Sequence, residues 1–121
     1  MMIKRSVLKE HYLNTSITNQ LSVLTLNLHY LQDLSNSSVE ESAVLHLVTE
    51  SQLFIEWTVS HVSLERNISF ATELVELQRL LSRWKLQWPE LWQSEQGKEE
   101  IAEIAAHWCD RLQMNVKAIA S

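Results

Sequence analysis

Histidine and glutamate are the side chains of this sequence that could bind a metal or perform acid–base chemistry. Two pairs, His46 with Glu50 and Glu103 with His107, are spaced four residues apart and would share one face of a helix. The Glu-x-x-His motif of di-iron helical proteins is absent. We therefore predict solvated surface pairs and no metal site. The five histidines are His11, His29, His46, His61 and His107.

Nucleophilic catalysis would require an activated cysteine or serine. The single cysteine, Cys109, lies two residues after His107, but residues two apart on a helix point in different directions. The sequence also lacks a Gly-rich phosphate loop, a Gly-x-Ser-x-Gly elbow and a dinucleotide fingerprint. Small helical ribonucleases contain an arginine a few residues before a histidine, and Arg5 and His11 have a similar spacing. A second supporting polar group is missing beside this pair. We predict no enzyme, no cofactor and a half-buried structural cysteine.

Tryptophan is the most frequent aromatic residue, with five copies against two Phe and two Tyr. Trp84, Trp88 and Trp92 recur every four residues, which would suit an aromatic platform for a cofactor, or for bases beside the basic segment 79–85. In the alternative interpretation, which we favour, Trp84 and Trp88 fill the core and Trp92 closes its end. The net charge of −5 also argues against nucleic-acid binding, because phosphate attraction needs a basic face.

Glycine and proline, the residues that most strongly interrupt regular structure, occur once each. Pro89 and Gly97 lie eight residues apart, so the chain is predicted to be all-α with its most irregular connection at 88–97. The 121 residues, 45% hydrophobic and 21% charged, are typical of one soluble globular domain spanning 1–121. Gly97 is expected to tolerate alanine, because it lies early in a helix or just before one.

Apolar residues at steps of three and four predict a short helical leader at 3–12 and four long helices. The long helices are expected over Ile17–Leu34, Val39–Trp57, Leu64 or Ser69 to Gln87, and from Ser94 onward. Short connections between them favour an antiparallel four-helix bundle. The stripe of the third helix is expected to pack against that of the fourth. These two stripes are Phe70, Leu74, Leu77, Leu81 and Trp84, and Ile101, Ala105, Trp108 and Leu112.

Local signals place the helix ends. Thr15 or Ser16 is a plausible N-cap for the first long helix, and Ser38 with Glu41 fits a capping box before the second. The β-branched and polar segment 58–62 is expected to be a connection.

The segment from His11 to Gln32 contains no Asp, Glu, Lys or Arg, but its scattered amide and imidazole groups argue against burial in a membrane. Its helix has a second apolar line beside the core stripe, and the next helix also has apolar residues off its main stripe. Such helices are usually buried on both faces, either within the bundle or against a partner. The candidate interface residues are Val23, Leu26, Tyr30, Leu45, Leu53 and Trp57.

Residues 50–57 and 73–78, followed by Arg83, Trp84, Trp88 and Trp92, resemble a group of small helical proteins of unknown function from cyanobacteria. The resemblance covers roughly the second half of the chain. It implies a cytoplasmic accessory or regulatory protein and provides no catalytic motif.

The leading hypothesis is a non-enzymatic interaction or regulatory module that forms a homodimer or binds another protein, without nucleic-acid or membrane partners. A cytoplasmic location is expected. The single Cys109 suits a reducing compartment, and Lys9 and Glu10 interrupt any N-terminal export signal. The alternative is a ligand-binding bundle with an apolar pocket lined by Trp84, Trp88 and Trp108.

Overall fold

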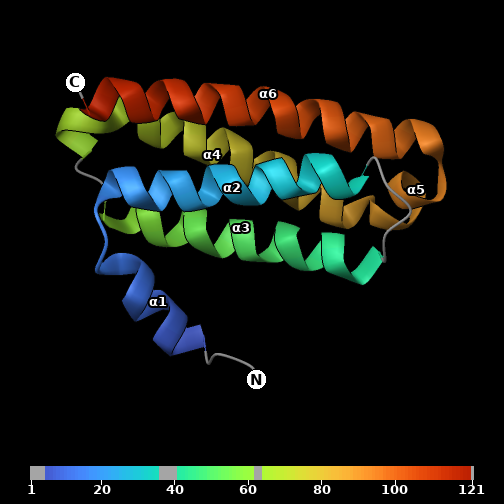
Figure 1. Cartoon of the computed structure of the whole chain (residues 1–121), viewed down its shortest axis with the longest axis horizontal. Helices are drawn as coiled ribbons and strands as arrows, with labels where there is room; N and C mark the ends of the chain where they lie inside the picture. Colours follow the sequence, from blue (N-terminus) through green and yellow to red (C-terminus); the bar gives the residue numbers. More distant parts are fainter. Residues whose placement is uncertain (1–4, 36–40, 62–63, 121) are drawn as a thin grey trace.

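A computed structural model describes residues 5–35, 41–61 and 64–120, which form six α-helices and no strand. The predicted all-α class is confirmed. Figure 1 shows the four longest helices side by side, α2 and α4 running in one direction and α3 and α6 in the other, with α1 below α3 in this view. The helices are α1 (Arg5–Leu13), α2 (Ile17–Ser35), α3 (Glu41–His61), α4 (Leu64–Leu86), α5 (Trp88–Gln93) and α6 (Glu95–Ala120).

Serine hydroxyls cap the start of two long helices. The amide of Asn19 donates to Ser16 Oγ at 3.1 Å, and the amide of Gly97 donates to Ser94 Oγ at 2.9 Å. Each bond satisfies an amide that has no partner within its own helix. Ser16 is therefore the N-cap of α2, whereas Thr15 donates backward to the main-chain oxygen of Tyr12. The capping box predicted from Ser38 lies outside the described residues.

The connection predicted at 58–62 is wrong for 58–61, because α3 continues to His61, and Val62 lies outside the described residues. Thr58 is fully buried and donates to the Gln20 side chain at 3.0 Å, and Val59 packs against the core. A β-branched residue lowers the stability of a helix by only about 0.5 kcal/mol relative to alanine. These tertiary contacts outweigh that small penalty.

Pro89 separates α4 from a further helix of one and a half turns. It occupies the first turn of α5, where a missing N–H has no intrahelical partner to lose. Ser94 is extended, with φ −117° and ψ 146°, and turns the chain into α6. Trp92 packs against the core, as predicted, and so does Leu91.

The core stripes of α4 and α6 are both buried, as predicted. The expected pairing of these two stripes is only partly right, because α6 packs most closely against α2, and α4 against α3. Ala102, Ala105 and Cys109 give α6 a narrow face that lets the α2 backbone approach. The Cys109 thiol reaches the main-chain oxygen of Thr25 at 3.4 Å. α4 and α6 are joined at their edge by Arg111, which donates to Glu73 at 2.7 Å.

α1 is held against α3 by an aromatic and polar cluster around Tyr12. The Tyr12 ring stacks on Phe54 with centroids 4.6 Å apart and lies 5.7 Å from the Trp57 ring. The hydroxyl is 2.6 Å from Thr58 Oγ1 and donates to the main-chain oxygen of Gln20 at 3.2 Å. Burial raises the pKa of Tyr12 to about 12, although the Thr58 hydrogen bond opposes the rise. The leader thus covers one side of α3.

The expectation that Gly97 tolerates alanine is wrong. Gly97 is buried where α6 crosses α5, and a Cβ atom there would lie 2.1 Å from the main-chain oxygen of Leu91. The φ angle of Gly97 is not positive, so conformational freedom is not the reason for glycine. The reason is the close approach of two backbones.

Candidate interaction surface

Three large apolar side chains of α2 remain exposed. Val23, Leu26 and Tyr30 are 39%, 47% and 47% exposed, although the neighbouring stripe of Leu24, Leu28 and Leu31 is fully buried. The packing of the helices therefore does not bury the second apolar line of α2. We call Val23, Leu26 and Tyr30 the α2 surface.

The surroundings of the α2 surface are polar but mostly uncharged. Asn19 and Ser22 are exposed on the same helix, and Ser22 donates to the main-chain oxygen of Thr18 at 3.0 Å. The exposed pair of His29 and Asp33, 3.4 Å apart, lies toward the C-terminal end. Uncharged polar groups can enter an interface without the desolvation cost of an ion.

The candidate interface residues of α3 lie differently. Leu45 and Leu53 are partly buried and pack against the core, and Trp57 is 4% exposed beneath Tyr12. The second apolar face of α3 is thus largely covered from within, by α1 and the core. Val23, Leu26 and Tyr30 are therefore exposed, whereas the Trp57 ring is buried.

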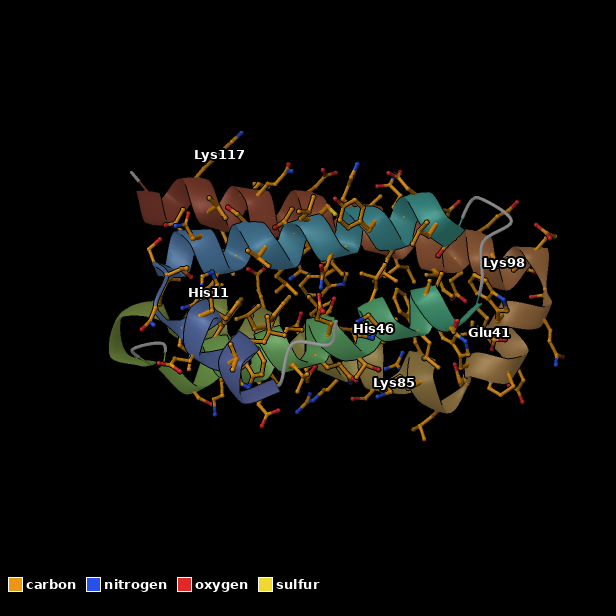
Figure 2. The ribbon with its side chains drawn as sticks, turned by 60° about the horizontal axis from the view of Figure 1, so that its bottom comes forward. His11, Glu41, His46, Lys85, Lys98 and Lys117 are labelled. Atoms are coloured by element: carbon orange, nitrogen blue, oxygen red, sulfur yellow. The ribbon has the colours of Figure 1, made fainter. Side chains whose placement is uncertain are left out.

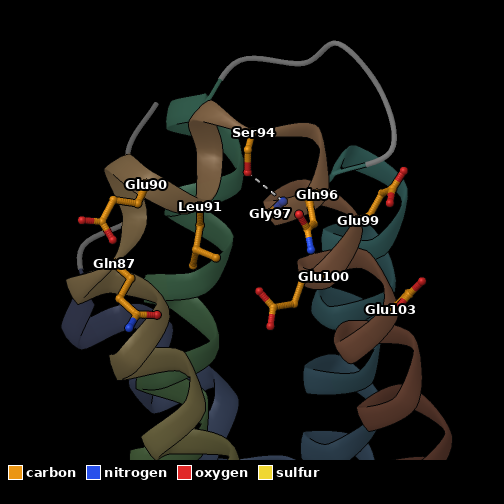
Figure 3. Close-up of a pocket in the computed structure, with 9 residues that line it drawn as sticks. All are labelled: Gln87, Glu90, Leu91, Ser94, Gln96, Gly97, Glu99, Glu100 and Glu103. Atoms are coloured by element: carbon orange, nitrogen blue, oxygen red, sulfur yellow. Dashed lines mark hydrogen bonds between the residues drawn. The ribbon is translucent and has the colours of Figure 1, made fainter.

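An acidic cavity of about 570 Å³ lies where α5 meets α6. Its lining includes four glutamates together with Leu91 and Gly97. Figure 3 shows that Glu100 points into this space, whereas Glu90, Glu99 and Glu103 point away from it. The carboxylates therefore do not converge on one point, as metal ligands would have to do.

The histidines whose side chains the structure describes do not assemble into a metal site either. Among the described residues, no three His, Cys, Asp or Glu side chains are close enough to hold an ion. Within α3, the exposed His46 lies 3.6 Å from the partly buried Glu50. Figure 2 shows His11 and His46 on separate helices and far apart along the molecule.

The tryptophans occupy the core rather than a pocket. Trp84, Trp88 and Trp108 are at most 6% exposed, and Trp92 stacks on Trp88 with ring centroids 5.6 Å apart. The ammonium of Lys98 lies 4.7 Å from the centre of the Trp92 ring. A buried ring offers no stacking face to a nucleic-acid base, so the aromatic platform is not formed.

Cys109 is enclosed between α2 and α6, more deeply than the half-buried position predicted. Burial raises its pKa from 9 to about 11, with smaller contributions from Asp110 and Asp33. The thiol is therefore protonated at neutral pH and shielded from reagents. We expect slow labelling by a disulfide reagent in the folded protein at about pH 8 and fast labelling in denaturant. Equal rates in both conditions would contradict the burial of Cys109.

The same pKa shift predicts a stability change at alkaline pH. A thiol whose pKa is 9 unfolded and about 11 folded stabilises the folded state fully below pH 9 and loses this contribution as pH rises toward 11. The melting temperature of the parent should therefore fall across this pH interval. The melting temperature of the Cys109→Ala variant should fall less steeply. Tyr12 adds a similar loss at higher pH, because its pKa is raised to about 12. If the melting temperatures of the parent and of Cys109→Ala fell in parallel as pH rises, the stability change would not come from Cys109.

A second cavity, of about 530 Å³, lies between α3 and α4, and a third, of about 190 Å³, lies between α2 and α6. None of the three cavities is lined by a tryptophan. The α3–α4 cavity was not predicted from the sequence. A signal for it exists in the outward residues Val75, Arg79, Ser82 and Leu86, which recur at steps of four, three and four.

In the described part of the chain, no helix is long and apolar enough to cross a lipid bilayer. The features above rest on geometry and chemistry alone. No family model matches this chain, and no curated protein or solved structure is detectably similar to it.

Proposed function

We propose that this protein is a non-enzymatic interaction module that self-associates through the α2 surface. The observation that supports the proposal is the exposure of Val23, Leu26 and Tyr30 on a helix with few charges. Burying one large apolar side chain fully contributes about 1.5–3 kcal/mol, which a monomer does not gain at these positions. A cytoplasmic location and an antiparallel four-helix bundle formed by α2, α3, α4 and α6 belong to this proposal.

The positions of the three residues suit a two-fold axis. α2 spans Ile17–Ser35, so Leu26 is its middle residue. When two copies of α2 cross antiparallel at Leu26, Val23 of one copy faces Tyr30 of the other. A two-fold dimer of this kind is the commonest closed assembly.

Three side chains are not a complete interface. Stable interfaces bury about 1,200–2,000 Å² in total, so the contact must extend to Asn19, Ser22 and the adjacent edge of α3. That edge contains Glu50, which accepts from Asn27 at 3.1 Å and is already paired within the protomer. A charge that is already hydrogen-bonded costs less to desolvate than a free one.

The test is Leu26→Glu, measured by light scattering at tens of micromolar. We expect a dimeric parent and a monomeric variant, because the substitution brings two carboxylates together at the axis. Met114→Glu is the matched control, since Met114 is 70% exposed on α6 and its replacement should leave the mass unchanged. A monomeric parent, or a dimeric Leu26→Glu, would refute the proposed interface.

The alternative of a ligand-binding bundle has less support. It required an apolar pocket lined by Trp84, Trp88 and Trp108, and these side chains are instead packed in the core. The resemblance to small helical cyanobacterial proteins fits an accessory or regulatory role and remains a prediction.

A further inference from the structure

The cavity between α3 and α4 is an open groove with an apolar floor. Ile55 and Val59 form its α3 side, and Val75 and Leu86 contribute from α4. Val75 is 40% exposed and Leu86 is 86% exposed, the largest exposure of any described large apolar side chain. We call this feature the α3–α4 groove. It shares no residue with the α2 surface.

Hydrogen bonds between the two helices hold the groove in shape. Gln52 donates to Ser82 Oγ at 2.9 Å, and Gln78 donates to the main-chain oxygen of Gln52 at 3.2 Å. Gln78 also lines the groove, and its buried Oε1 accepts no hydrogen bond from the described residues. The groove is therefore built by fixed polar contacts as well as by apolar packing.

The rim of the groove is cationic, although the protein carries a net charge of −5. Arg79 and Arg83, one turn apart on α4, both line it. Neither guanidinium has a hydrogen bond or ion pair within the described part of the chain, whereas Arg111 is bound to Glu73 and lies over Trp108. No carboxylate occurs in the sequence between Glu76 and Glu90. Glu56 is the single acidic residue of the lining.

A ligand with both anionic and apolar groups could be a small molecule or an amphipathic helix. The open shape of the groove favours the helix. Small-molecule sites usually enclose about 70–90% of the ligand surface, which a groove walled by the exposed Val75 and Leu86 cannot do. An amphipathic helix, in contrast, needs only one of its faces covered. Two arginines four residues apart match carboxylates spaced one helical turn apart, and arginine binds carboxylates in a bidentate manner.

We propose that the α3–α4 groove binds an acidic amphipathic helix of another protein. Its apolar side chains, spaced three and four residues apart, lie on Ile55, Val59, Val75 and Leu86. Its carboxylates, one turn apart, pair with Arg79 and Arg83. This site is independent of self-association through the α2 surface.

The probe is a fluorescein-labelled synthetic helical peptide of about 18 residues, about 27 Å long, with leucines on one face and two glutamates one turn apart at its edge. Fluorescence anisotropy is measured with the parent and with Leu26→Glu, so that the outcome does not depend on the oligomeric state. We expect saturable binding to both that weakens as salt is raised. The double variant Arg79→Glu/Arg83→Glu should bind at least about tenfold more weakly.

Charge exchange provides the decisive control. A peptide with lysines in place of the two glutamates should bind Arg79→Glu/Arg83→Glu better than it binds the parent. Lys85→Glu makes the same kind of charge change on α4 outside the groove lining and should leave binding of the acidic peptide within about twofold. Circular dichroism checks folding, and Arg79→Gln/Arg83→Gln replaces the glutamate variant if that variant unfolds.

Several outcomes would overturn the proposal. The first is that the acidic peptide does not bind. The second is that the lysine peptide binds the parent as tightly as the acidic peptide does. The third is that Lys85→Glu weakens binding of the acidic peptide as much as Arg79→Glu/Arg83→Glu does. Displacement of the peptide by sodium decanoate below its micellar concentration would assign the groove to a small amphiphile instead. A change of mass in Arg79→Glu/Arg83→Glu would make the occupant a second copy of this chain.

Discussion

Gly97→Ala is expected to destabilise the folded protein by about 1–3 kcal/mol. The added methyl group would lie 2.1 Å from the main-chain oxygen of Leu91 and 2.8 Å from its carbonyl carbon. Backbone atoms cannot rotate away as a flexible side chain can, so α5 must move off α6 or the first turn of α6 must unwind. Urea denaturation followed by circular dichroism gives the change in free energy of unfolding.

Gln96→Ala is the control for Gly97→Ala. Gln96 precedes Gly97 in the first turn of α6 and is exposed, so its truncation should change stability by no more than about 0.5 kcal/mol. If Gly97→Ala unfolded at the same urea midpoint as the parent, the backbones of α5 and α6 would have to be farther apart at Leu91 and Gly97 than described above.

Leu77→Ala and Leu81→Ala should each lower the free energy of unfolding by about 2–5 kcal/mol. Both leucines are at most 1% exposed on the inner stripe of α4. Removing their side-chain atoms loses apolar burial and leaves a cavity that rigid neighbouring helices fill incompletely. Differential scanning calorimetry or urea denaturation gives the size of the loss.

Leu86→Ala is the matched control for the two cavity variants. It makes the same substitution in the same helix at a side chain that is 86% exposed, and its cost should be within about 0.5 kcal/mol. If all three variants melted alike, the inner stripe of α4 would be misassigned.

Local periodicity and capping predicted much of the fold. The steps of three and four in the stripes of α4 and α6 correctly identified the buried residues, and Ser16 was one of the two N-caps proposed for α2. These features depend on residues within one or two turns of each other, which is why the sequence alone reveals them.

Features that depend on contacts between distant helices were not predicted. Thr58 is helical because Tyr12 and Gln20 bind it, and Gly97 is required because Leu91 lies across it. α6 was predicted to pack against α4, whereas the small residues Ala105 and Cys109 bring it closest to α2. In each case the cause is an interhelical distance, for which hydrophobic periodicity carries no information.

The candidate site was predictable only in part. The run without Asp, Glu, Lys or Arg from His11 to Gln32 pointed to Val23, Leu26 and Tyr30, which are exposed. Trp57 looked similar in sequence but is covered by α1, whose docking depends on a cluster that spans α1, α2 and α3. The use of the α2 surface as an interface stays a prediction.

The close packing of α6 on α2 also bears on how the chain acquires its structure during synthesis. α2 ends at Ser35 and α6 begins at Glu95, so the closest helix pair is also widely separated in sequence. Because domains are synthesised from the N-terminus, α2 leaves the ribosome long before its partner exists. Until α6 arrives, the side of α2 that α6 will cover stays open to water, even when α3 already packs on the other side of the helix. The nascent chain is therefore most prone to wrong association in that interval, and completion of α6 ends it.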